Sequence, residues 1–106
     1  MEFPKYNKVE IRRKKWRGKW YYAIKDIVKA LMDTPNTKGY LKDLRNRKPK
    51  LKKDWDKLTK QILLPTNRYN QHVRSAHAEN LKKIVEFIPF KKKEEFFVWL
   101  DRVDHE

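Results

Sequence analysis

The sequence predicts a small single domain of the α+β class, with two short β-hairpins and four to five helices. Two observations predict this class. The spacing of apolar residues changes near Ala23 from the alternation of a strand to the spacing of a helix. Farther along, Pro35, Pro49 and Pro89 separate segments that each carry one apolar stripe. A length of 106 residues suits one compact domain.

The first predicted hairpin leads into the first helix. We expect residues 1–8 to form a flexible N-terminal arm, and residues 9–13 to begin the hairpin because apolar and polar residues alternate there. A turn is expected at Arg17 and Gly18, since glycine tolerates positive φ. The aromatic run that follows favours a second strand over 20–24, and helical spacing begins at its end.

Two basic helices are predicted next. Asn36 or Thr37 can cap the first of them, and Pro49 ends it. Residues 51–58 then show helical spacing again. The expected apolar faces of these two helices are Tyr40, Leu41 and Leu44, and Leu51, Trp55 and Leu58.

A second hairpin and a pair of helices complete the predicted fold. Residues 62–64 indicate a short buried strand, 65–67 a turn and 68–74 a return strand. Ser75 or His77 can cap the next helix. The apolar stripes of the helix pair are Leu81, Ile84, Val85 and Ile88 before Pro89, and Phe96, Trp99, Leu100 and Val103 after it. Burial preference assigns to the core Trp20, Trp55, Trp99, Phe87, Phe96 and Tyr40.

Positive charge is concentrated in one half of the chain. Residues 1–60 contain 20 basic and 7 acidic side chains, a net charge of +13, whereas residues 61–106 contain 8 and 7, a net charge of +1. A field of one sign over half of a small domain attracts polyanions. The charge distribution therefore favours nucleic-acid binding over a merely solvated lysine-rich surface.

Catalysis and metal binding find little support in the sequence. The chain has no cysteine, so disulfides and thiolate metal sites are excluded. His72 and His77 do not have the spacing of a helical zinc pair, and Asp54 and Asp56 alternate on a predicted helix and point apart. No apolar run approaches the ~20 residues of a membrane span. We expect no enzymatic activity, no cofactor, no metal, no membrane contact and a cytoplasmic location.

Two surfaces are candidates for nucleic-acid contact. A two-stranded ribbon can enter the major groove of DNA, and an aromatic side chain at its tip can stack on a base. In the first hairpin the candidates are Arg12, Arg13, Lys14, Lys15, Trp16, Arg17 and Lys19. On the first basic helix they are Lys38, Lys42, Arg45, Asn46, Arg47 and Lys48. The alternative for both surfaces is a solvated basic face, with Trp16 folded back onto the core.

Four segments of the chain also follow one another in an informative order. They are a hairpin leading into an Asp-Ile helix (9–28), a proline loop followed by a Tyr-, Leu-, Lys- and Arg-rich helix (33–47), a Leu-Pro segment (63–65), and two helices joined by Ile-Pro with a Trp-Leu pair in the second (81–103). In this order they resemble the Bro-N domain of phage and prophage antirepressor-like proteins, the BRO family. One departure is that Arg74 and His77 stand where members of the family often have aspartate.

The resemblance implies that residues 9–106 form a DNA-binding domain that acts in transcription regulation. Charge supports the nucleic-acid part of this expectation independently. Two alternatives stay open: a protein-binding module that grips a repressor or another acidic partner, and an RNA-binding domain whose aromatic residues stack on single strands. Homo-oligomerisation is also left open.

Overall fold

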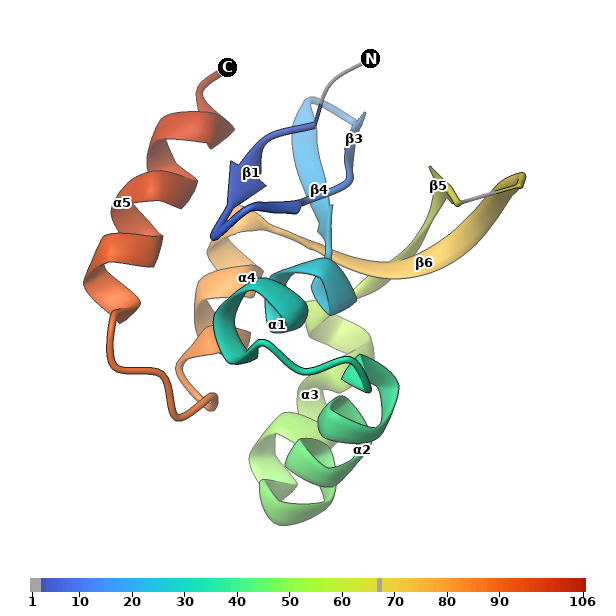
Figure 1. Ribbon diagram of the computed structural model, residues 1–106. Coiled ribbons are helices and arrows are strands. Elements are labelled where there is room, and N and C mark those ends of the chain that lie inside the picture. The colour runs from blue at the N-terminus through green and yellow to red at the C-terminus, as the bar shows by residue number, and fades with distance from the viewer. Residues whose placement is uncertain (1–2, 67) are drawn as a thin grey trace.

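Helices pack around two antiparallel sheets, which is the predicted α+β class (Figure 1). The computed structural model describes residues 3–66 and 68–106. Within them the strands are β1 (Lys5–Tyr6), β2 (Val9–Glu10), β3 (Arg13–Trp16), β4 (Lys19–Ala23), β5 (Lys60–Pro65) and β6 (Asn70–His77). The helices are α1 (Ile24–Met32), α2 (Thr37–Arg47), α3 (Pro49–Leu58), α4 (Ala78–Val85) and α5 (Lys93–Asp104).

The N-terminal segment differs from the flexible arm that we expected over residues 1–8. β1 pairs with β2, and Tyr6 is buried against α5. Its ring lies 5.3 Å from that of Phe96 and 5.2 Å from that of Trp99, centroid to centroid. Burial of this aromatic ring offsets the entropy of ordering the segment. Residues 1–2 lie outside the described residues.

The expected strand over 9–13 is divided in two. Residues 9–10 belong to β2 in the small two-stranded sheet, whereas β3 begins at Arg13 in the larger sheet. Between them, the fully buried Ile11 continues the pairing through a hydrogen bond from its N–H to the carbonyl of Pro4. The predicted turn is confirmed: Arg17 and Gly18 both have positive φ, 51° and 80°, and join β3 to β4. Two positive-φ residues match the twist of a tight hairpin.

The larger sheet has the strand order β3-β4-β6-β5, with the main core on one face and a smaller cluster on the other. Tyr22 of β4 and Ala76 of β6 pair with each other and are fully buried in the main core, where α1 and α4 pack on the sheet. On the other face, a second cluster comprises Ala23, Ile62, Leu64 and Val73, with Trp16 and Tyr21 packed against it. This second cluster binds the β5–β6 hairpin to the rest of the sheet.

Helices α2 and α3 lie together at one end of the molecule (Figure 1). The side chain of Asn36 accepts a hydrogen bond from the N–H of Gly39 at 3.0 Å, which confirms it as the cap of α2. A Cβ on Gly39 would lie 2.5 Å from Asn36 Nδ2, so the glycine leaves room for its own cap. Pro49 occupies the first turn of α3, where its missing N–H costs little.

The predicted core is confirmed in part. Phe96 and Trp99 are buried, as are the other residues of the two C-terminal apolar stripes. The remaining aromatic residues predicted for the core are partly buried and packed against it: Trp20, Tyr40, Trp55 and Phe87. His77 rather than Ser75 caps α4, with Nδ1 accepting from the N–H of Asn80 at 3.5 Å.

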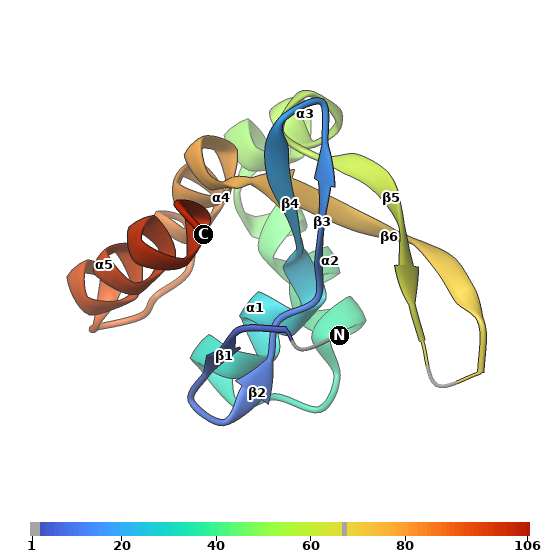
Figure 2. The same cartoon turned by 90° about the horizontal axis from the view of Figure 1, so that it is seen from above.

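The β5–β6 hairpin projects from the body of the protein (Figure 2). Pairing between β4 and β6 ends at Ala23 with Ser75, whereas pairing between β5 and β6 continues to Pro65 with Asn70. The outer part of the hairpin therefore extends beyond β4 as a two-stranded ribbon. The turn predicted over 65–67 includes Asn67, which lies outside the described residues.

Candidate nucleic-acid interface

Arg12, a predicted contact residue, is engaged inside the protein. Its Nε and Nη2 donate to the two carboxylate oxygens of Asp26 at 2.8 and 3.0 Å, and its backbone N–H donates to the same carboxylate. Nη1 donates to the carbonyl of Pro65 at 2.8 Å. Bonding to Asp26 raises the pKa of Arg12. The guanidinium therefore joins β5 to α1, and we assign it a structural role.

Arg13 is engaged in a similar way. Its guanidinium carbon lies 3.9 Å from the centroid of the Trp20 ring, and Nη1 donates to the carbonyl of Val103 at 2.7 Å. Nη2 lies 3.4 Å from a carboxylate oxygen of Glu106. Because the side chain is only 10% exposed, Arg13 fastens the end of α5 to the sheet rather than facing a partner.

The rest of the first predicted surface remains accessible. Lys14, Lys15, Arg17 and Lys19 are exposed on the β3–β4 hairpin. Trp16 is half-buried, with Arg17 4.5 Å and Lys60 4.3 Å from its ring centroid. The indole packs on the second core cluster, which is the folded-back arrangement that we considered for it.

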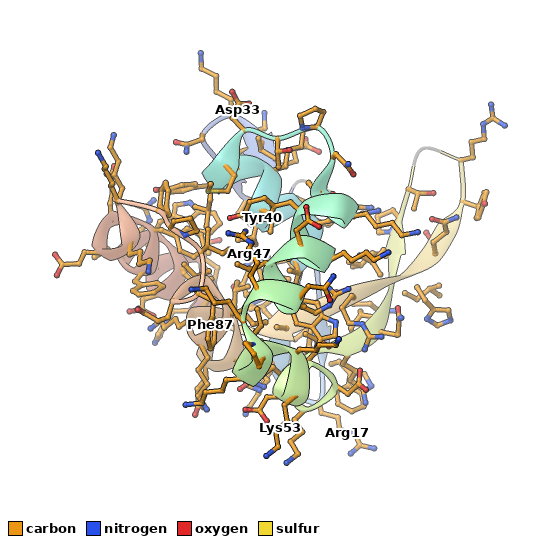
Figure 3. All side chains as sticks on the ribbon, turned by 90° about the horizontal axis from the view of Figure 1, so that it is seen from below. Arg17, Asp33, Tyr40, Arg47, Lys53 and Phe87 are labelled. Carbon is orange, nitrogen blue, oxygen red and sulfur yellow. The ribbon has the colours of Figure 1, made fainter. Side chains whose placement is uncertain are left out.

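The basic residues of α2 divide between two sides of the helix. Positions 38, 42 and 45 follow helical spacing, so these side chains lie on one side, with Asn46 beside Lys42. Arg47 lies on the other side of the helix, near Tyr40 (Figure 3). Burial raises the pKa of Tyr40, and the positive charge of Arg47 lowers it by a smaller amount. Lys48 is at the junction of α2 and α3. The structure thus separates Arg47 from the other candidates on the helix.

A hollow of about 320 Å³ lies between α2 and the base of the β5–β6 hairpin. We call it the α2 groove, and define it by Lys25, Lys38, Leu41, Arg45, Trp55 and Arg74. The guanidinium carbon of Arg45 lies 4.6 Å from the centroid of the Trp55 ring, which holds it at the groove wall. Four cationic side chains from α1, α2 and β6 thus converge on one concavity.

Sequence reasoning missed two of these four cations as contact residues. Lys25 is the second residue of α1 and Arg74 lies in β6, so neither belongs to a basic run. The one sequence signal for Arg74 was that it stands where Bro-N domains often have aspartate, which indicated a more basic surface at that position. Lys25 also lines a second, larger hollow, whose lining includes Gln71 and the acidic residues Glu10 and Asp26.

Among the residues that the structure describes, no acidic side chain lines the α2 groove itself. Asp56 lies 3.7 Å from the guanidinium of Arg74, but its side chain is 90% exposed. No acidic residue occurs in the sequence between Asp56 and Glu79, a stretch that includes the whole β5–β6 hairpin. Cations in a concave surface reinforce one another's field, so the groove is suited to a polyanion.

Other kinds of site are not found in the part of the chain that the structure describes. Residues 3–66 and 68–106 contain no group of three or more histidine, cysteine or acidic residues placed to hold a metal ion. None of the described helices is long and apolar enough to cross a membrane.

Comparison with known proteins does not assign the chain to a family. No family model matches it, and no curated protein or solved structure matches it either.

Proposed function

We propose that this chain is a duplex-DNA-binding domain of a phage antirepressor-type transcriptional regulator, without catalytic activity of its own. The observation that carries the DNA-binding part is the convergence of Lys25, Lys38, Arg45 and Arg74 on the α2 groove. The regulatory part rests on the resemblance to Bro-N domains.

The chemistry of the groove favours phosphate as its ligand. Lysine and arginine neutralise phosphate groups and release counterions, which supplies most of the sequence-independent affinity for DNA. The aromatic ring of Trp55 is covered by Arg45, so the groove does not offer the open stacking platform that single strands use. This arrangement favours duplex DNA over single-stranded RNA or DNA.

The test compares duplex DNA, single-stranded DNA and RNA of equal length by fluorescence anisotropy. A Lys38→Ala, Arg45→Ala double variant should bind duplex DNA about tenfold or more weakly, because two phosphate contacts are lost. The matched control is Arg47→Ala with Lys91→Ala, which removes the same charge from exposed positions elsewhere. Equal losses in the two variants would mean that net charge alone, and not the α2 groove, binds the DNA.

Two results would support one of the alternative functions instead. Preference for RNA or single-stranded DNA over the duplex would support the RNA-binding alternative. Failure to bind any nucleic acid, together with capture of a repressor, would support the protein-binding module.

A further inference from the structure

The β5–β6 hairpin differs chemically from the basic surfaces around it. Between Lys60 and Arg74 the chain has one charged residue, Arg68, although 40% of all residues are charged. The exposed side chains of this ribbon carry mainly amide, imidazole and phenol groups: Gln61, Tyr69, Asn70, Gln71 and His72. Such uncharged donors and acceptors do not neutralise phosphate charge, and they include the amide groups that pair with base edges in the grooves of DNA.

One face of the ribbon continues the wall of the α2 groove. Because side chains alternate along a strand, Asn70 and His72 lie on the same face as Arg74, which lines that groove. In β5, Gln61 pairs with Arg74 and Leu63 with His72, so Gln61 joins this face. Gln61 and His72 thus lie next to Arg74 on this face, whereas Asn70, farther out along β6, lines a hollow with Arg13 and Lys14 of the β3–β4 hairpin.

The ribbon is held at a defined orientation to the helices. Arg12 bonds to the carbonyl of Pro65 near the end of β5 and, through both carboxylate oxygens, to Asp26 of α1. On its other face the second core cluster packs the ribbon against Trp16 and Tyr21. A recognition element that is already oriented loses less entropy on binding.

We propose that the β5–β6 hairpin enters the major groove of duplex DNA and reads adenine-containing base pairs through Gln61, Asn70 and His72. The α2 groove then holds the phosphates next to the site. This inference rests on the proposed function and assigns sequence discrimination to the hairpin rather than to α2. A two-stranded ribbon fits the major groove, where asparagine and glutamine pair with the N6 and N7 edge of adenine.

The test begins with duplexes enriched by the wild-type protein from a random pool. Affinity for the enriched duplex is then compared with affinity for a scrambled duplex of the same composition. In an Asn70→Ala, His72→Ala variant the ratio of these two affinities should fall about tenfold or more, with little change for the scrambled duplex. The Lys38→Ala, Arg45→Ala variant should lose affinity for both duplexes and keep the ratio.

The matched control is Gln71→Ala, which removes a similar group from the opposite face of the same strand. Its ratio should stay at the wild-type value. An unchanged ratio in the Asn70→Ala, His72→Ala variant, or an equal loss in the Gln71→Ala control, would overturn the inference while leaving DNA binding intact. A wild-type protein that binds duplexes without preference would also overturn it, whereas a protein that binds no duplex would refute the proposed function itself.

Base substitution separates the major groove from the minor groove. Replacing adenines of the enriched duplex by 7-deazaadenine removes only the major-groove N7 acceptor. The wild-type protein should lose affinity, and the Asn70→Ala, His72→Ala variant should lose less because its contacts are already gone. Equal losses in both proteins would place the reading of adenine outside the hairpin.

Discussion

Arg12 holds two distant segments together through a single guanidinium group. Replacing it with alanine leaves the carboxylate of Asp26, which is only 13% exposed, without its partner. We expect Arg12→Ala to lower the free energy of unfolding by about 3 kcal/mol, in the range for breaking a largely buried ion pair. Denaturant unfolding measures the change, with the exposed Lys14→Ala as control. Equal stability of the two variants would show that the bridge contributes nothing.

His77 makes the stability of the fold depend on pH. Burial, and then the positive charge of Lys19, lower its pKa, and its neutral Nδ1 accepts the capping bond of α4. The unfolded chain therefore takes up the proton first, with a pKa of about 6.5. The neutral ring of His77 contributes fully to the free energy of unfolding above that pH. This contribution is lost as the pH falls through the lower pKa of the folded state.

A substitution at His77 can isolate this dependence. His77→Asn keeps a capping acceptor but does not titrate, so we expect a flatter dependence of the free energy of unfolding on pH as the pH falls below about 6.5. A wild-type slope in His77→Asn would contradict the assignment.

At the scale of elements, α5 depends on its aromatic anchor. Trp99 is buried, with its ring 5.7 Å from that of Phe96 and 5.2 Å from that of Tyr6. Trp99→Ala should lower the free energy of unfolding by ~3–5 kcal/mol, the usual cost of truncating a large core side chain. Val98→Ala, at a neighbouring position that is 69% exposed, should change it by only about 0.5 kcal/mol. Chemical denaturation of both variants checks the difference.

The β3–β4 hairpin combines structural and accessible basic residues. Lys14→Ala with Lys15→Ala should leave the melting temperature unchanged and reduce the salt dependence of DNA binding by up to about 1 per lysine. Adding Arg13→Ala should lower the melting temperature, because its bonds to α5 are lost. Unaltered DNA affinity in the folded Lys14→Ala, Lys15→Ala variant would remove this hairpin from the interface.

Local signals account for what could be predicted among the elements. The turn at Gly18, the cap at Asn36 and the stripe that contains Trp99 depend on neighbours in sequence, and the structure confirms each of them. The pairing of β1 with β2 could not be predicted, because two-residue strands have no recognisable period. Arg12 was predicted as a contact residue because it belongs to a basic run. Its partner Asp26 lies 14 residues away, so the sequence alone did not reveal the ion pair.

The candidate groove shows the same limit at the scale of the whole molecule. The cations of α2 were visible in the sequence as a basic run, but Lys25 and Arg74 join them only through the packing of α1 and β6 beside α2. Conversely, Arg47 belongs to the same run and lies on the other side of the helix. The sequence indicated that the surface is basic, but tertiary packing determines which cationic side chains line the same groove.

The net charge of +14 allows one direct test of the central claim, that this protein engages DNA through its basic surface. Fluorescent duplex DNA is titrated with the protein at several salt concentrations. We expect tight binding, with the logarithm of the association constant falling linearly against the logarithm of salt concentration, at a slope equivalent to about 4–8 phosphates. Absent or only millimolar binding at low salt would contradict the account.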